Sequence, residues 1–505
     1  MTAPAAMPFA TRGVRGLAGR LAAAACAALA GGCASVDPYR HEPVRAHVER
    51  ADPIGDCARL FRDLDARIDA AGVRDAGAPR VPGFPYLRVD RFTASLGERT
   101  DALRGAGFAA WSELMAGADR QARAVEIANA GDPVPLAALD ACRYALAVAD
   151  QGELARLREA ARVPDDYSTA ARVLGLYPLT RIFFAAGIRD WQQRTLEVFA
   201  MPEAALPVAG RLRLYVPAAE PPEFTPPPAS AAFGLPAVSR AELERWVRRH
   251  APALEVDTVS DDDRIGALHW SAADPPVVAV DTARPVAYVR TVLATLGGRP
   301  RQQLVYTFWF PARPPEHAFD LLAGRLDGLI WRVTLDETGE PLVFDSIHPC
   351  GCYHLFFPTA AVVARPQPST LDEGLFAPQA APALRAGERI VLRVATRTHY
   401  LQRVAARPQA GLAGEGYALR DERGLAMLDR PAGGTRSAYD SAGFVPGTER
   451  AERWLFWPMG IASAGQMRQW GRHATAFVGR RHFDDAGLLD RYFEPRRAGA
   501  ADDRR

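Results

Sequence analysis

Residues 303–310 read QLVYTFWF and residues 329–335 read LIWRVTL, and these two stretches decide the fold class. Both are rich in β-branched and aromatic residues, and in the second stretch the side chains alternate in a pattern typical of strands. The loop DETGE (336–340) contains the glycine that a five-residue hairpin connection often uses, so residues 342–345 are the expected partner strand. Residues 389–404 (RIVLRVATRTHYLQRV) indicate a further long strand or strand pair. The C-terminal half is therefore predicted to be β-rich.

The first half of the chain has helical rather than alternating periodicity. Apolar residues recur at helical spacing in two sets: Cys57, Leu60, Phe61, Leu64 and Ile68, then Leu136, Leu139, Cys142 and Leu146. A proline-dense stretch follows, and a helix is expected to start at Ser239, where Glu242 completes a capping-box pattern. The predicted fold class is α+β, an α-helical N-terminal domain followed by a β-rich C-terminal domain. The predicted boundaries are 1–32 signal peptide, 33–52 polar tether, 53–205 helical domain, 206–237 proline-rich linker, 238–490 β-rich α+β domain and 491–505 polar tail.

The composition excludes several classes of function. All 61 basic residues among the 505 are arginine, so the chain has no lysine for a pyridoxal-phosphate Schiff base or for a nucleotide-binding GK[ST] loop. A net charge of +2 gives no electrostatic footprint for nucleic acid. Neither a G-x-S-x-G nor a G-x-G-x-x-G motif is present. With 48% hydrophobic residues the chain is an ordinary globular one.

The N-terminus reads as a secretion signal. Three arginines precede an Ala/Leu-rich stretch over residues 21–30, and the segment LAGGC ending at Cys33 resembles the lipobox of bacterial lipoprotein signal peptides. It departs from the commonest lipobox by having Ala30 at the third position before the cysteine. The resemblance implies lipidation of Cys33, and Ala34 in place of aspartate implies sorting to the outer membrane, with the mature chain facing the periplasm. A plain signal-peptidase site or an uncleaved anchor is the alternative.

Two further cysteines lie on apolar faces of predicted helices. In an oxidising periplasm, Cys57 and Cys142 are expected to form a disulfide. Closing so long a loop should stabilise the helical domain by roughly 4 kcal/mol.

The segment 345–354 (DSIHPCGCYH) carries the densest grouping of chemically active side chains. His348, Cys350, Cys352 and His354 occupy every second position directly after a predicted strand. Two thiols and two imidazoles form a ligand set that zinc or copper prefers, so a zinc or copper site is the leading hypothesis. A fully extended strand would hold the outer histidines about 20 Å apart, so the intervening proline and glycine would have to bend the chain. Donors that could complete the site are His399, His473, His482 and Asp345.

Three other interpretations fit the same four residues. Cys350 or Cys352 could be the nucleophile of a hydrolase or acyltransferase, with His348, His354 or a distant histidine as the base. The two cysteines could instead cycle as a strained dithiol pair. The alternation is also typical of a half-buried strand whose cysteine and histidine side chains belong to the core.

A second grouping near the C-terminus is basic. Arg468, Arg472, Arg480 and Arg481 lie within fourteen residues, and guanidinium groups bind carboxylate or phosphate bidentately. They predict an anion-binding site, although a run of charges is also typical of a solvated helix face.

These patterns together predict a periplasm-facing outer-membrane lipoprotein of unknown specific activity that binds zinc or copper through its His/Cys segment. One alternative is a Cys/His-dependent hydrolase or acyltransferase of the cell envelope. The other is a non-catalytic envelope binding or assembly lipoprotein. The expected partners are outer-membrane lipid, through the N-terminal lipid, and a protein of the envelope.

Overall fold

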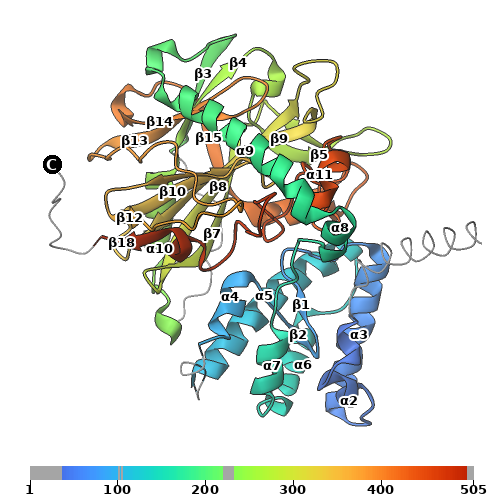
Figure 1. Ribbon diagram of the computed structural model, residues 1–505. Coiled ribbons are helices and arrows are strands. Elements are labelled where there is room, and N and C mark those ends of the chain that lie inside the picture. Colours follow the sequence, from blue (N-terminus) through green and yellow to red (C-terminus); the bar gives the residue numbers. More distant parts are fainter. Residues whose placement is uncertain (1–36, 100–102, 104–105, 220–231, 497–505) are drawn as a thin grey trace, which may run out of the picture.

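A ten-stranded mixed sheet forms the larger part of the molecule, and the helices of the N-terminal part pack together beside it (Figure 1). The computed structural model describes residues 37–99, 103, 106–219 and 232–496. The helices come first along the chain and most of the strands follow, so the predicted α+β class is confirmed. The predicted signal peptide and Cys33 lie outside the described residues.

The N-terminal helices enclose a core of their own. Helix α3 (Pro53–Ala71) begins where Asp52 accepts a hydrogen bond from the amide of Gly55, with Pro53 as its first residue, and ends at Gly72 in the left-handed conformation. The helices of this unit are α2 (Val44–Val48), α3 (Pro53–Ala71), α4 (Arg91–Leu96), α5 (Ala106–Ala130), α6 (Leu136–Ala149) and α7 (Leu154–Ala160), joined by the hairpin of β1 (Arg80–Val81) and β2 (Phe84–Arg88).

The predicted disulfide is present in this helical unit. Cys57 of α3 and Cys142 of α6 are bonded, with their Cα atoms 5.0 Å apart. Both residues lie on the faces that the two helices turn toward the shared core, as the spacing of the apolar residues predicted.

The large sheet has the strand order β11-β10-β9-β8-β7-β15-β3-β4-β13-β14. Its pairs are antiparallel except where β15 lies beside β7 and β3 and where β13 lies beside β4. The predicted hairpin is its central feature, because Leu335 pairs with Pro341 across the DETGE loop. The strands are β3 (Arg211–Pro217), β4 (Ala253–Thr258), β7 (Val286–Leu296), β8 (Arg299–Arg313), β9 (Gly324–Leu335), β10 (Pro341–Ile347), β11 (Leu355–Pro358), β13 (Glu388–Val394), β14 (Leu401–Pro408) and β15 (Glu415–Asp421).

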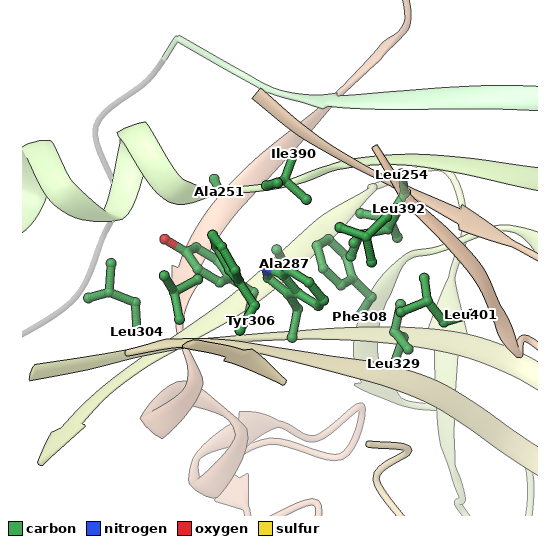
Figure 2. Close-up of a cluster of buried hydrophobic side chains, with 14 of the residues drawn as sticks. Ala251, Leu254, Ala287, Leu304, Tyr306, Phe308, Leu329, Ile390, Leu392 and Leu401 are labelled. Atoms are coloured by element: carbon green, nitrogen blue, oxygen red, sulfur yellow. The ribbon is translucent and has the colours of Figure 1, made fainter. Parts of the chain in front are cut away.

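The core of this part lies on one face of the sheet. Alternate residues Leu304, Tyr306 and Phe308 of β8 point to this face, where they meet Leu254 of β4 and Leu392 of β13 (Figure 2). Helix α10 (Arg240–His250) closes the core and begins, as predicted, after Ser239, whose hydroxyl accepts from the amide of Glu242. Strands from opposite halves of the sheet thus share one core, which requires the sheet to curl.

The two edge strands are tied together by the loop that precedes β13. The amide of Phe356 in β11 donates to the carbonyl of Phe376, and the amide of Ala381 donates to Pro358. At the opposite edge, the side-chain amide of Gln379 bonds the backbone of Val404 in β14. The loop therefore covers edge positions that would otherwise be open to pairing with another chain.

Smaller elements surround the sheet. They are α8 (Thr169–Leu174), α9 (Tyr177–Ala200), α11 (Arg453–Phe456), α12 (Leu488–Tyr492), and the pairs β5 (Ala267–Trp270) with β6 (Val278–Asp281), β12 (Val362–Ala364) with β18 (Phe493–Pro495), and β16 (Leu428–Asp429) with β17 (Thr435–Arg436). No helix among the described residues has both the length and the apolar character needed to cross a bilayer.

The predicted boundaries shift in four places. The predicted tether over 33–52 is folded from Pro38 onward, and α2 buries Val44 in the helical core. Helix α9 packs its Trp191 and Phe199 against the large sheet, although the sequence assigned it to the helical domain. The predicted linker 206–237 contributes β3 to the middle of the sheet, and the predicted tail 491–505 begins with β18. Periodicity reports which residues are apolar, but not which core they join.

Candidate functional site

The predicted His/Cys segment forms a tight turn rather than an extended strand. It connects β10 to β11, and the amide of His348 donates to the carbonyl of Cys352 at 3.0 Å. Gly351 has φ 88, and a Cβ there would lie 2.6 Å from the carbonyl oxygen of Ala474. Only glycine fits so close a backbone approach at that φ. The segment is therefore a turn and not a half-buried strand, but its cysteine and histidine side chains do lie in the core, as that interpretation expected.

The turn sends its two histidines to different partners. His348 Nδ1 lies 3.2 Å from Asp327, whereas His354 Nε2 lies 2.8 Å from Asp345, whose carboxylate also pairs with Arg332 at 2.6 Å. The part of the chain that the structure describes contains no group of three or more His, Cys, Asp or Glu side chains placed to hold a metal ion. The ligand set predicted from the sequence is therefore not assembled there.

The three remote histidines also lie in different places in the structure. His399 joins His348 through a shared aspartate, as described below. His473 is buried with neither ring nitrogen hydrogen-bonded, and His482 lies among carboxylates, 3.3 Å from Asp165 and 3.6 Å from Asp485. Of the three remote histidines, only His399 meets a histidine of the segment, His348, in one site, whereas His354 meets Asp345.

That site is a buried chain of alternating imidazoles and carboxylates. Asp327, near the start of β9, bonds His348 Nδ1 through Oδ1 and His399 Nδ1 through Oδ2, the latter at 2.8 Å. His399 Nε2 in turn lies 3.4 Å from Asp263, at ion-pair distance but too poorly aligned for a hydrogen bond. The ring of His399 stacks on Phe310 with centroids 3.9 Å apart, which fixes its plane. All four members of the chain are buried.

The charges in the chain favour an ionised Asp327 beside a protonated His399. Burial alone would raise the pKa of Asp327, but the facing imidazoles of His348 and His399 outweigh it and hold that pKa well below its ordinary value. Burial would likewise lower the pKa of His399, but its contacts with Asp263 and Asp327 raise it above the ordinary value. Asp327 is thus an anion that orients both rings.

His348 also borders a small cavity. The cavity, of about 20 Å³, has room for about one water molecule. No hydrogen bond among the described residues engages His348 Nε2. Ser346, two positions earlier and so on the same face of the strand, lines the same cavity. Tyr353, Tyr400 and Trp191 of α9 also line the cavity.

Two phenols lie against the imidazole. The ring centroids of Tyr353 and Tyr400 are 5.1 and 5.8 Å from that of His348. Burial raises the pKa of both phenols, so each keeps its proton and can donate a hydrogen bond. Arg313 donates to the hydroxyl oxygen of Tyr400 at 3.3 Å, which makes that hydroxyl a better donor.

Backbone strain gathers around this site. Leu326, Tyr353, Arg397 and His399 all have φ between 51 and 63, in the left-handed region that bulky residues rarely adopt. Each adjoins or belongs to the buried chain and its cavity. Strained backbone of this kind persists only where the surrounding contacts hold it in place, and it is common at functional sites.

The two cysteines of the turn are separated from this chemistry. Both are buried in an apolar cluster with Trp309 and Met467. Hydrogen bonding to Cys350, followed by burial, raises the pKa of Cys352 well above its ordinary value. A nucleophilic cysteine needs a lowered pKa, so Cys352 has the opposite environment.

The predicted arginine cluster is engaged within the fold. Arg468 donates to the carbonyls of Cys350 and Ala462, and Arg481 to that of Thr475. The other two pair with carboxylates, Arg472 with Asp166 and Arg480 with Asp165. All four guanidinium groups therefore have protein partners, and the segment is neither a shared anion site nor a solvated helix face.

Several members of the site were not identified from the sequence. They are Asp263, Arg313, Asp327, Ser346 and Tyr400. One signal was available: Asp327 lies inside the apolar stretch that includes LIWRVTL, and a carboxylate in a buried strand needs partners. Nothing local to it indicates which partners those are.

Searches of protein-family models, of curated proteins and of solved structures returned no match for this chain. The chemistry of the site therefore has to be inferred from its own geometry.

Proposed function

We propose that the protein is a lipid-anchored envelope hydrolase in which His348 is the general base. One observation carries the proposal: an imidazole oriented by a buried, ionised aspartate presents its other nitrogen to a water-sized cavity. A base held by a carboxylate is the arrangement that hydrolases on many unrelated folds use. This favours an enzyme over the metal hypothesis, because the base and its aspartate are assembled whereas the predicted ligands are not. The nucleophile differs from the predicted one, since water or Ser346 takes the place of a cysteine.

The proton-transfer steps follow from the hydrogen bonds. With Nδ1–H donating to Asp327, the lone pair of His348 lies on Nε2, which accepts the proton of a water molecule or of the Ser346 hydroxyl as that oxygen attacks a carbonyl carbon. The protonated ring then returns the proton to the leaving oxygen, so that the alcohol departs. When water attacks, the other product is the acid. When Ser346 attacks, the other product is an acyl-serine, which a water molecule then hydrolyses to the acid with His348 again as the base. Tyr400, polarised by Arg313, is the donor for the developing oxyanion.

The test compares two buried histidines of one turn. His348→Gln should reduce the hydrolysis of p-nitrophenyl acetate, or of a panel of other small esters, by about 100-fold or more, because general-base catalysis has that magnitude. His354→Gln is the matched control: His354 is also buried and bonded to an aspartate, but it does not line the cavity. Equal activity of the two variants, both folded by circular dichroism, would refute the proposal.

The Ser346→Ala variant shows whether the attacking oxygen comes from Ser346 or from water. If a covalent acyl-serine forms, this variant loses activity to the same extent as His348→Gln, and mass spectrometry of the native enzyme detects the acylated peptide. If water attacks directly, Ser346→Ala keeps most of the activity. Either result is compatible with His348 as the base.

The membrane location is proposed from the lipobox resemblance at Cys33. A Cys33→Ala variant, or globomycin treatment, should leave an unprocessed precursor and release the protein from the outer-membrane fraction. Unchanged mobility and fractionation would refute lipidation, and would leave the proposal for His348 standing.

A further inference from the structure

The surface from Val173 in α8 to Gly187 in α9 is mostly apolar, and the partly exposed Arg181 is its charged member. Every exposed residue from Val173 to Gly187 lacks a polar side chain, and Phe183 is 77% exposed. The large members of this surface are Val173, Leu174, Leu176, Leu179, Ile182 and Phe183. Helix α9 changes character beyond Gly187, where Arg189, Asp190 and Arg194 are exposed. Such a contiguous apolar surface marks a contact with something outside the chain.

Helix α11 extends the same surface. Trp454, Leu455 and Trp457 are exposed, Trp454 by 72%. The ring of Phe456 in α11 meets that of Phe184 in α9, with centroids 5.3 Å apart, so the two helices adjoin, as in Figure 1. We call the apolar side chains of both helices the apolar ridge.

The conformation of Leu176 indicates that the ridge makes a contact outside the chain. This residue caps the start of α9 with φ 49, a conformation that glycine or asparagine adopts at lower cost. Its side chain is exposed, so it contributes nothing to the core. The fold would be more stable with a smaller residue there, and a leucine is explained by a contact that it makes outside.

We propose that the apolar ridge docks into the surface of the lipid bilayer. Tryptophan and arginine favour the bilayer interface. Arg453 lies over Trp454, and Arg181, two residues after Leu179 in α9, pairs with Asp372 at 3.7 Å. The four residues from Cys33 to Asp37 reach at most about 14 Å, so the proposed anchor would keep the folded part at the bilayer. A protein tethered this closely to the bilayer meets lipid at a higher effective concentration than any other apolar partner.

Docking would also bring the candidate site close to lipid. Trp191, which lines the cavity beside His348 and contacts Tyr353 at 5.4 Å, follows Phe183 by eight residues, or about 12 Å along α9. The substrates in reach are then esters carried by lipids. This assignment of substrate class rests on the hydrolase proposed above, whereas the docking rests only on the proposed lipid anchor at Cys33.

The test uses residues 33–505 carrying Cys33→Ser, so that no lipid anchor contributes, and vesicles of phosphatidylethanolamine and phosphatidylglycerol. The protein should float with the vesicles, and the double variant Leu179→Asp, Phe183→Asp should bind at least about tenfold more weakly, because two large apolar side chains lose their burial. Tyr144→Asp is the matched control, because Tyr144 is 74% exposed and lies on α6 of the helical unit. Phe183→Trp should retain binding.

Absence of vesicle binding by the parent protein would overturn the proposal. A second result would also overturn it: light scattering shows that the parent is a dimer and the double variant a monomer, while both bind vesicles equally. The ridge would then be the contact between two copies of the chain. His348→Gln should bind vesicles as tightly as the parent. Docking and catalysis are therefore tested separately, and either can fail alone.

Discussion

His473 provides the sharpest test of the buried electrostatics, because replacing it with leucine should stabilise the protein, and most strongly in mild acid. The residue is 2% exposed and neither ring nitrogen has a hydrogen-bond partner. Burial, reinforced by the charge of Arg468, lowers its pKa to about 3. The carbonyl of Pro349 favours the protonated ring, but its alignment is too poor for a hydrogen bond.

The size of the effect follows from the difference between the folded and unfolded states. The unfolded chain protonates this ring at a pKa of about 6.5, whereas the folded protein keeps it neutral down to much lower pH. Below pH 6.5 the unfolded state therefore binds a proton that the folded state does not, and stability falls as the pH falls. Between pH 7 and pH 5 this one residue should reduce the free energy of unfolding by about 2 kcal/mol. The His473→Leu variant does not lose this stability, because leucine has no proton to bind.

Urea unfolding followed by tryptophan fluorescence at pH 7 and pH 5 measures the difference. The stability of His473→Leu relative to the parent should rise by about 2 kcal/mol between the two pH values. His317→Leu, at an exposed site, should give the same difference at both. A stability difference for His473→Leu that is independent of pH would refute the reasoning. So would zinc that stabilises the parent but not this variant, because the imidazole would then have a metal as its partner.

Three further perturbations test the fold. Replacing Cys57 and Cys142 together by alanine should lower the free energy of unfolding by about 4 to 5 kcal/mol, because the bond closes a loop between residues 85 apart; a loss under 1 kcal/mol by urea unfolding would contradict this. Arg332→Met should lower the free energy of unfolding by about 3 to 5 kcal/mol, because Asp345 would remain buried without its cation. The double variant Arg332→Met, Asp345→Asn should recover part of that loss in the same urea measurement. Gly339→Ala should destabilise by about 1 to 3 kcal/mol, because φ is 85 and the new Cβ would meet a buried indole; an unchanged melting temperature would show that the loop relaxes.

The catalytic proposal depends on a chain of contacts that no single pattern in the sequence indicates. His348 follows β10, Asp327 lies in β9 and His399 lies in the turn between β13 and β14. Phe310 of β8 pairs with Asp327 and also stacks on His399, so one strand positions two members of the site. The sequence indicated His348 and His399 as reactive residues, but not the aspartate that joins them.

Local patterns in the sequence determined the α+β division, the DETGE hairpin, the start of α10 and the pairing of Cys57 with Cys142. Each depends on residues two to five positions apart, or on two cysteines that both lie on apolar helix faces. Only the tertiary structure decided that α9 packs on the sheet, that the His/Cys segment turns and separates its ligands, and that His348, Asp327 and His399 meet. These outcomes depend on which distant strands pair and in which register. Alternation does not specify either, because any half-buried strand with the same pattern offers the same apolar face.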